Sequence, residues 1–129
     1  MNVLLDTHTL LWLVSKPGTV NPEVLSQLAD PATTVSVSAA SAWEISIKTK
    51  LGRLDGTTLL ATWNSQMEAM RVEDLEIDSA DAILAGRLPW EHRDPFDRVI
   101  VAQALRRNLT IATRDATILA ATLTPTLKA

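Results

Sequence analysis

The chain has 129 residues, of which 47% are hydrophobic, and this length and composition suit one domain with its own core. Its formal net charge of −3 excludes the strongly basic proteins that capture nucleic acid by overall charge. Without cysteine, disulfides, thiolate zinc sites and cysteine nucleophiles are excluded. The amino terminus has no basic leader and reaches an acid after three apolar residues, so we expect a cytoplasmic protein with no membrane anchor.

Short apolar or β-branched runs predict five strands along the chain. The first is a buried strand directly after the amino terminus, and the last contains Pro125, which is tolerated only in an edge strand. The predicted strands lie at about residues 3–5, 33–37, 74–77, 109–113 and 122–126.

Helix signals separate these strands. Capping residues and apolar residues at spacings of three to four predict helices at about residues 7–14, 22–29, 39–51, 59–70, 79–87 and 96–107. Gly52 is expected to end the third of them. Strands that alternate with helices imply βαβ units, a mainly parallel sheet and helices on both of its faces. The fold class is therefore α/β, with residues 1–129 as one domain.

Four acidic residues stand out from this background. Asp6 and Asp115 each lie just past the carboxyl end of a predicted strand, where parallel sheets form ligand crevices. Glu44 and Asp97 lie in helices among apolar neighbours. Simpler interpretations remain open, because either aspartate can cap the helix that follows and Glu44 can pair with Lys48 one turn away.

Carboxylates that converge in a chain with no cysteine and few histidines favour a hard, oxygen-preferring cation. Mg²⁺ fits this description, and Mn²⁺ is a possible substitute. Such an ion can activate water and stabilise the charge on a phosphoryl group, so hydrolysis of a phosphodiester is the expected chemistry.

Four segments, in this order and spacing, resemble PIN-domain toxins of the VapC family. They cover nearly the whole chain: Leu5-Asp6-Thr7-His8, Trp43-Glu44-Ile45-Ser46-Ile47-Lys48 with Leu51-Gly52-Arg53-Leu54, His92-Arg93-Asp94-Pro95-Phe96-Asp97-Arg98 with Ala102-Gln103-Ala104, and Thr113-Arg114-Asp115. One departure is that residues 119–129 lack the aromatic residue that many members carry late in the chain.

This resemblance implies a three-layer α/β/α sandwich and a Mg²⁺-dependent endoribonuclease. It also implies that the protein is the toxin of a type II toxin–antitoxin system, with RNA as substrate and a cognate antitoxin protein as partner. The family's acidic metal site maps onto Asp6, Glu44, Asp97 and Asp115, with Asp6 and Asp97 as its direct ligands. Supporting hydroxyl groups map onto Thr7 and Thr113. Together with the apolar helices around Trp12 and Trp63, the resemblance further predicts a homodimer.

Other residues near these motifs receive secondary roles. Four cations could line an RNA path, although solvated surface charge is the default for each of them: Lys48, Arg93, Arg98 and Arg114. Asp94 is expected to cap a helix. We do not expect His8 or His92 to bind metal, because oxygen ligands suffice for Mg²⁺ and neither histidine has a typical metal-binding spacing. Trp90 is expected near a substrate cleft or partner groove.

Two other functions compete with the nuclease. A non-catalytic, Mg²⁺-binding regulatory module of the receiver type also gathers acids at the carboxyl edge of a parallel sheet. It needs an acid pair near the first strand, however, and Asp6 is followed here by Thr7-His8. A phosphatase of the haloacid-dehalogenase type needs Asp-x-Asp after that strand, which is missing too.

Overall fold

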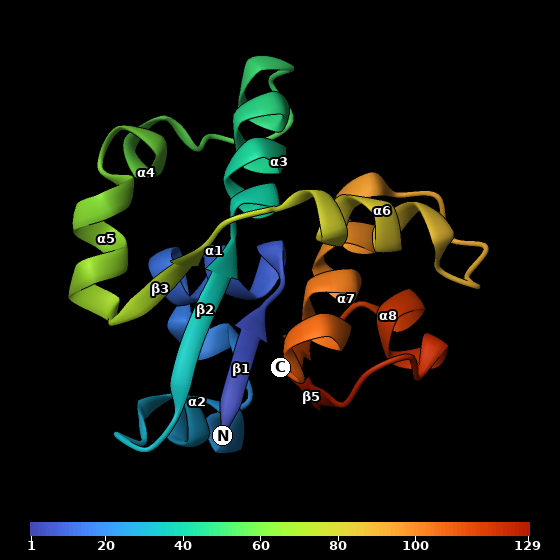
Figure 1. Cartoon of the computed structure of the whole chain (residues 1–129). Coiled ribbons are helices and arrows are strands. Elements are labelled where there is room, and N and C mark those ends of the chain that lie inside the picture. The colour runs from blue at the N-terminus through green and yellow to red at the C-terminus, as the bar shows by residue number, and fades with distance from the viewer.

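Five parallel strands form the centre of the fold in the computed structural model, which describes residues 1–129 (Figure 1). Their spatial order is β3-β2-β1-β4-β5. The strands are β1 (Asn2–Leu5), β2 (Thr34–Ser38), β3 (Val72–Leu75), β4 (Thr110–Thr113) and β5 (Thr126–Lys128). The chain adds β2 and β3 on one side of β1, and then β4 and β5 on its other side. The strand order therefore reverses between β1 and β4, which is where open α/β sheets bind ligands.

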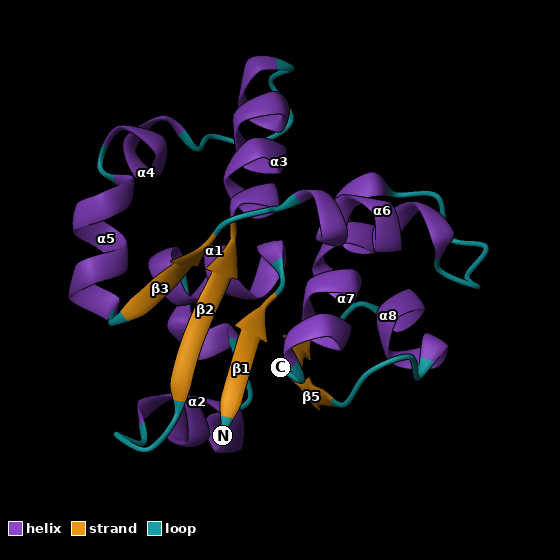
Figure 2. Ribbon diagram, in the orientation of Figure 1, coloured by secondary structure: helices purple, strands orange, loops and turns teal.

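Helices cover both faces of this sheet (Figure 2). They are α1 (Thr7–Ser15), the short 3-10 turn η1 (Pro17–Thr19), α2 (Pro22–Ala29), α3 (Ala39–Lys50), α4 (Thr57–Ala61), α5 (Trp63–Met70), α6 (Ser79–Arg87), α7 (Pro95–Arg107) and α8 (Ala116–Ala121). None of these helices is long and apolar enough to cross a membrane.

Alternation along β1 divides the core into two layers. Val3 and Leu5 pack with residues of α1, α3, α4 and α5, whereas Leu4 packs on the opposite face with residues of α6, α7 and α8. All three side chains are fully buried. Successive residues of a strand point to opposite faces, so both faces of this short strand are covered, as expected for a parallel sheet. The predicted α/β fold with a parallel sheet and helices on both faces is confirmed.

Three predicted elements differ from the structure. The helix predicted at 59–70 is divided into α4 and α5 at Thr62, whose backbone leaves the helical conformation (φ −118°, ψ 23°). The third strand begins earlier than predicted, at Val72, because Val72 packs in the core. The last strand follows Pro125 instead of containing it, and the carbonyl of Pro125 accepts a hydrogen bond from Ile111 N.

The turn after α3 packs against that helix at Gly56. A Cβ atom on Gly56 would lie 2.6 Å from Ile45 Cγ2 and 2.7 Å from Thr49 Oγ1, so a larger residue does not fit without movement. The N–H of Gly56 donates a hydrogen bond to Thr49 Oγ1. As predicted, Gly52 follows the end of α3, with a left-handed backbone (φ 73°). Gly56 is thus packed closely on α3, the helix that carries Glu44.

Candidate metal centre

Acidic side chains lie at the carboxyl ends of β1 and β4, where the strand order of the sheet reverses. Asp6 directly follows β1 and is only 4% exposed. Its Oδ1 caps α1 by accepting a hydrogen bond from Thr9 N at 2.9 Å, and its Oδ2 accepts one from the hydroxyl of Thr113. The same hydroxyl accepts a hydrogen bond from Asp115 N at 3.0 Å. Thr113 therefore links the two acids at this edge of the sheet.

Asp115 lies beside Asp6 and caps α8. Its Oδ1 accepts hydrogen bonds from Thr117 N and Ile118 N, so the capping role that the sequence left open is present. A small pocket of about 150 Å³ lies between the two acids and is lined by Asp6, His8, Trp12, Arg114 and Asp115. The capping contacts use only Oδ1 and leave Asp115 Oδ2 without a hydrogen-bond partner, so capping and metal binding are compatible.

The first half of α3 contributes a buried glutamate and a second hydroxyl contact. The side chain of Glu44 is 5% exposed and pairs with Lys48 Nζ at 2.6 Å. The pairing predicted as the simpler interpretation is therefore present, but the carboxylate is buried instead of lying at the surface. Thr7 donates a hydrogen bond from Oγ1 to Ser41 Oγ at 2.9 Å, which joins the start of α1 to α3.

Asp97 lies at the start of α7, where several negative charges meet. Its side chain is 16% exposed, and its Oδ2 lies 2.7 Å from His92 Nε2. Burial raises the pKa of Asp97 to about 6, against the opposing effect of the His92 hydrogen bond. The negative charges of Asp94, Asp115 and Glu44 raise this pKa further. The pKa of Asp97 is therefore affected by carboxylates of α3 and of the β4–α8 connection, two segments that are far from Asp97 in the sequence.

The most compact group of possible metal ligands differs from the predicted one. One ligand atom each of His92, Asp94 and Asp97 lie within 4.8 Å of one another. The four predicted acids do not form so compact a group among themselves. Asp94 also caps α7 as predicted, since its Oδ1 accepts hydrogen bonds from Phe96 N and Asp97 N. Sequence reasoning set His92 aside, and the signal that could have found it is the spacing His-x-Asp-x-x-Asp across a helix start.

The cations near the site have very different partners. The guanidinium of Arg98 donates to four main-chain carbonyls, those of Ala85, Leu88, Trp90 and His92. Arg98 therefore holds a loop in place instead of facing solvent as an RNA contact would. Arg114 lies 4.4 Å from the centre of the Trp12 ring and donates to the carbonyls of Thr19 and Ala129.

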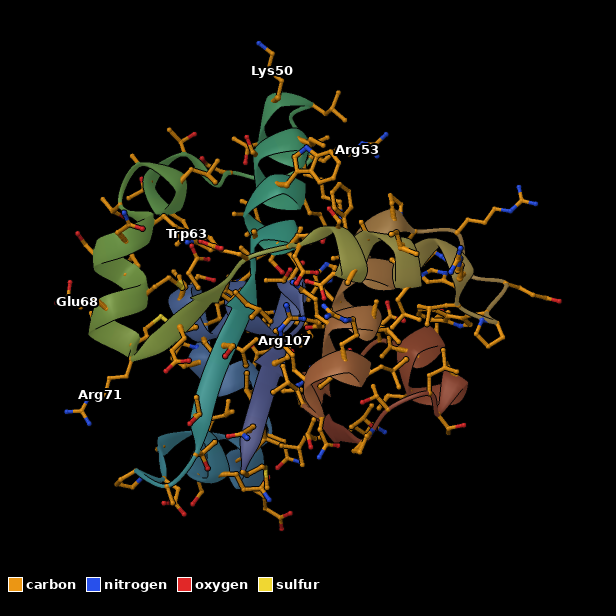
Figure 3. All side chains as sticks on the ribbon, in the orientation of Figure 1. Lys50, Arg53, Trp63, Glu68, Arg71 and Arg107 are labelled. Carbon is orange, nitrogen blue, oxygen red and sulfur yellow. The ribbon has the colours of Figure 1, made fainter.

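Among the cations predicted to line an RNA path, Arg93 is exposed and has no ion pair. It lines a surface pocket of about 680 Å³ together with Trp90 and His92. Trp90 and His92 also line an adjoining pocket of about 580 Å³. Two further cations, Lys50 and Arg53, lie at the far end of α3 and extend away from the sheet (Figure 3).

The donor set suits a divalent cation at the carboxylate crevice. Carboxylate and hydroxyl oxygens from four elements are available, and these are the ligands that Mg²⁺ and Mn²⁺ accept. Burial raises the pKa of Asp97 most and the negative charges of Asp94, Asp115 and Glu44 raise it further, so a bound cation would stabilise the ionised carboxylate.

Comparisons with known proteins agree with this arrangement. A family model described as PIN domain matches residues 3–122 of the chain. A search of curated proteins finds no match to the sequence.

Solved structures share the fold at low sequence identity. A chain of VapBC2 from Rickettsia felis, bound to a DNA fragment from its promoter, is 16% identical with a TM-score of 0.73, and 98% of each chain is covered. A chain of VapBC-1 from nontypeable Haemophilus influenzae is 20% identical with a TM-score of 0.70, covering 98% of this chain and 97% of that one. A toxin–antitoxin complex from Klebsiella pneumoniae gives 17% identity and a TM-score of 0.62, covering 97% and 95% of the two chains.

Proposed function

We propose that this chain, which belongs to the PIN-domain family, is a Mg²⁺-dependent endoribonuclease and the toxin of a type II toxin–antitoxin pair. The observation that carries the proposal is the crowding of negative charge on Asp97. Burial raises the pKa of this carboxyl most, and the carboxylates of Asp115 and Glu44 raise it further from two other elements, at the point where strand order reverses.

Within this site we assign Asp6 and Asp97 as direct ligands of Mg²⁺, or of Mn²⁺ in its place, with Glu44 and Asp115 completing the acidic set. A bound divalent ion would activate a water molecule and neutralise the charge that develops on the scissile phosphate. Thr113 holds Asp6 Oδ2 and the main chain of Asp115 in fixed positions. Lys48 neutralises Glu44, and its release from Glu44 would leave a free cation next to the acidic set.

The partners that we propose are RNA, a cognate antitoxin protein and a second copy of the chain. An exposed apolar stripe on α3 supports a protein partner. Trp43, Ile47 and Leu51 recur at intervals of four residues on this helix and are 57%, 36% and 60% exposed. Trp12 and Trp63, from which the homodimer was predicted, are instead half-buried against the core.

The nuclease is tested by incubating the purified chain with total RNA in Mg²⁺ and in a chelator. We expect cleavage only with metal, and a loss of at least about 100-fold in Asp6→Asn and in Asp97→Asn, since each removes a charged ligand and keeps the side chain's shape. The matched control is Glu68→Gln, because Glu68 lies exposed on α5, away from the centre (Figure 3). Full activity in both aspartate variants would contradict the assignment.

The same experiment separates the nuclease from a receiver-type module. A non-catalytic module would bind the metal, visible as an increase in melting temperature, and would leave RNA intact at every metal concentration. Sedimentation of the chain alone, and with a candidate antitoxin protein, tests the two protein partners. A monomer at micromolar concentration would contradict the homodimer.

A further inference from the structure

We propose that His92, Asp94 and Asp97 form a second cation site, which binds a borderline transition-metal ion such as Zn²⁺ or Mn²⁺ in preference to Mg²⁺. The site shares Asp97 with the carboxylate centre proposed above. It does not depend on nuclease activity, because it rests on the geometry around His92.

The positions of the ligand atoms suit one ion. Each of the three residues offers an atom within 4.8 Å of the other two, and His92 Nε2 lies 2.7 Å from Asp97 Oδ2. Neighbouring ligands of an ion at about 2.1 Å lie about 3 Å apart, so only a small separation of this pair is needed to admit the ion. Asp94 uses Oδ1 to cap α7, and its Oδ2 makes no hydrogen bond. One oxygen of Asp94 is therefore available as the third ligand.

The imidazole is held in place from two sides by groups outside the cluster. Arg98 donates to the carbonyls of His92 and Trp90, at 2.9 and 2.7 Å, and so fixes the main chain of the segment that carries the ring. The ring of Trp90 packs against the imidazole, with ring centres 4.8 Å apart. Arg98 directly follows Asp97 in α7. The same surrounding contacts therefore orient the histidine and the aspartate, and metal ligands are usually oriented by such neighbouring groups.

The ligand set determines which ion is preferred. Mg²⁺ favours oxygen ligands, whereas an imidazole nitrogen suits Zn²⁺ and other transition metals, and affinity in mixed sites rises from Mn²⁺ toward Zn²⁺. Two carboxylates and a neutral imidazole also balance the charge of a divalent ion. The segment that carries His92 lies between two open surface pockets of about 680 and 580 Å³, which provide a path for the ion.

Asp97 has two carboxylate oxygens, and Oδ2 is the one that faces His92. Oδ1 is therefore free to bind an ion at the proposed site of Asp97 with Asp6, Glu44 and Asp115. Two ions that share a carboxylate in this way lie about 4 Å apart in known two-metal sites.

The proposal can be tested spectroscopically, because the chain contains only two histidines. With one equivalent of Mn²⁺ on the full chain, pulsed electron paramagnetic resonance should detect the nitrogen of a coordinated imidazole. We expect this signal to vanish in His92→Gln and to persist in His8→Gln. His8 is a matched control, since it is exposed and lines the neighbouring pocket with Asp6. A signal that persists in His92→Gln, or is absent in the unmodified chain, would overturn the proposal.

Calorimetric titration gives a second readout. We expect His92→Gln to weaken the tightest Zn²⁺ site at least tenfold and to change Mg²⁺ binding less than twofold. If His92→Gln does not fold, Asp94→Asn serves instead, because asparagine caps a helix equally well and lacks the charge. It should weaken Zn²⁺ by a similar factor. Equal losses for Zn²⁺ and Mg²⁺, or no loss of Zn²⁺ affinity, would contradict the site.

Asp6→Asn distinguishes the failure of this inference from the failure of the proposed nuclease. Asp6 is outside the His92 group, so this variant should lose RNA cleavage and keep the nitrogen signal. A nitrogen signal in a chain that never cleaves RNA would support the cation site and contradict the proposed nuclease. Metal-dependent cleavage without any nitrogen signal would support the nuclease and contradict the cation site.

Discussion

Two aspartates of the α6–α7 pair occupy the same local position and have opposite electrostatic environments. Asp81 and Asp97 are each the third residue of a helix whose N-cap is an aspartate three positions earlier, in the sequences Asp-Ser-Ala-Asp and Asp-Pro-Phe-Asp. Burial opposes ionisation of Asp81, but hydrogen bonds from Arg107 and Arg106 hold its pKa well below the usual range. Burial raises the pKa of Asp97 to about 6, and no guanidinium contacts it.

The arginines of α7 explain this difference. Arg106 and Arg107, in the last turn, each approach Asp81 Oδ1 to 2.6 Å and so join α7 to α6. Arg98, in the first turn, directs its guanidinium to the main-chain carbonyls of Ala85 and Leu88, although it directly follows Asp97. One carboxylate is therefore neutralised within the fold, and the other remains available for a cation from solution. A repeated sequence motif does not by itself show which of its copies is structural.

The largest expected effect comes from breaking the neutralised pair. Asp81→Asn keeps the shape of a side chain with no exposed surface and removes the buried charge that both arginines share, leaving them only the exposed carboxylate of Asp78. We expect the free energy of unfolding to fall by about 3 kcal/mol, near the lower end for buried pairs, because both arginines can reach water. Urea denaturation at pH 7 measures this change. A loss below about 1 kcal/mol would show that the pair contributes little to stability.

The matched substitution at the other aspartate should act in the opposite direction. Asp97→Asn removes a charge that burial and neighbouring acids disfavour, so the metal-free variant should be more stable than the unmodified chain at pH 7. The pKa shift corresponds to about 2 kcal/mol after allowance for local relaxation. Urea denaturation in the presence of a chelator measures it. Destabilisation by Asp97→Asn would mean that its contact with His92 outweighs the repulsion.

These two differences should also depend on pH with opposite signs. The folded-state pKa of Asp97 is raised, so the advantage of Asp97→Asn should be full above about pH 6 and should disappear as pH falls below the unfolded value of 3.8. The pKa of Asp81 is lowered, so the stability that it provides is full above 3.8 and is lost on further acidification. Denaturation curves of all three proteins from pH 3 to 8 test both trends. Parallel pH profiles for the two variants would contradict the contrast.

A smaller effect is expected at the arginine beside Asp97. Arg98→Lys keeps the charge but cannot donate to four carbonyls in the geometry of a guanidinium. We expect a loss of about 1 kcal/mol, together with faster hydrogen exchange in residues 88–93, which the guanidinium holds. Exchange detected by mass spectrometry locates the change. Unaltered exchange in this segment would show that other contacts hold the loop.

The smallest effect is expected at the N-cap of α6. The side chain of Asp78 is 55% exposed, and Asp78→Asn keeps a residue that caps equally well. The melting temperature should therefore change by less than about 2 °C. This variant is the control for Asp81→Asn, because it lies in the same capping box and contacts the same Arg106. A change as large as that of Asp81→Asn would show that the whole capping box of Asp78 and Asp81, and not Asp81 alone, stabilises the fold.

Much of this molecule follows from short-range physics and was accessible from the sequence. The capping roles of Asp6, Asp94 and Asp115 are all present, because a cap depends on the residues within one helical turn. The strands and the parallel sheet follow from residue patterns that repeat over a few positions. The ends of elements differ from the prediction where packing competes with local preference. Val72, for example, belongs to β3 because its side chain packs in the core.

The partners of the buried charges were decided only by the tertiary structure. No local pattern separates Asp81 from Asp97, because the difference is that α7 arginines reach Asp81 across the α6–α7 packing, whereas the guanidinium of Arg98 is directed to main-chain carbonyls and not to Asp97. The approach of His92 to Asp97 likewise depends on a loop that Arg98 holds through its carbonyls. Electrostatic interactions in a fold depend on distance and burial, and both of these are determined by packing between elements rather than by spacing along the chain.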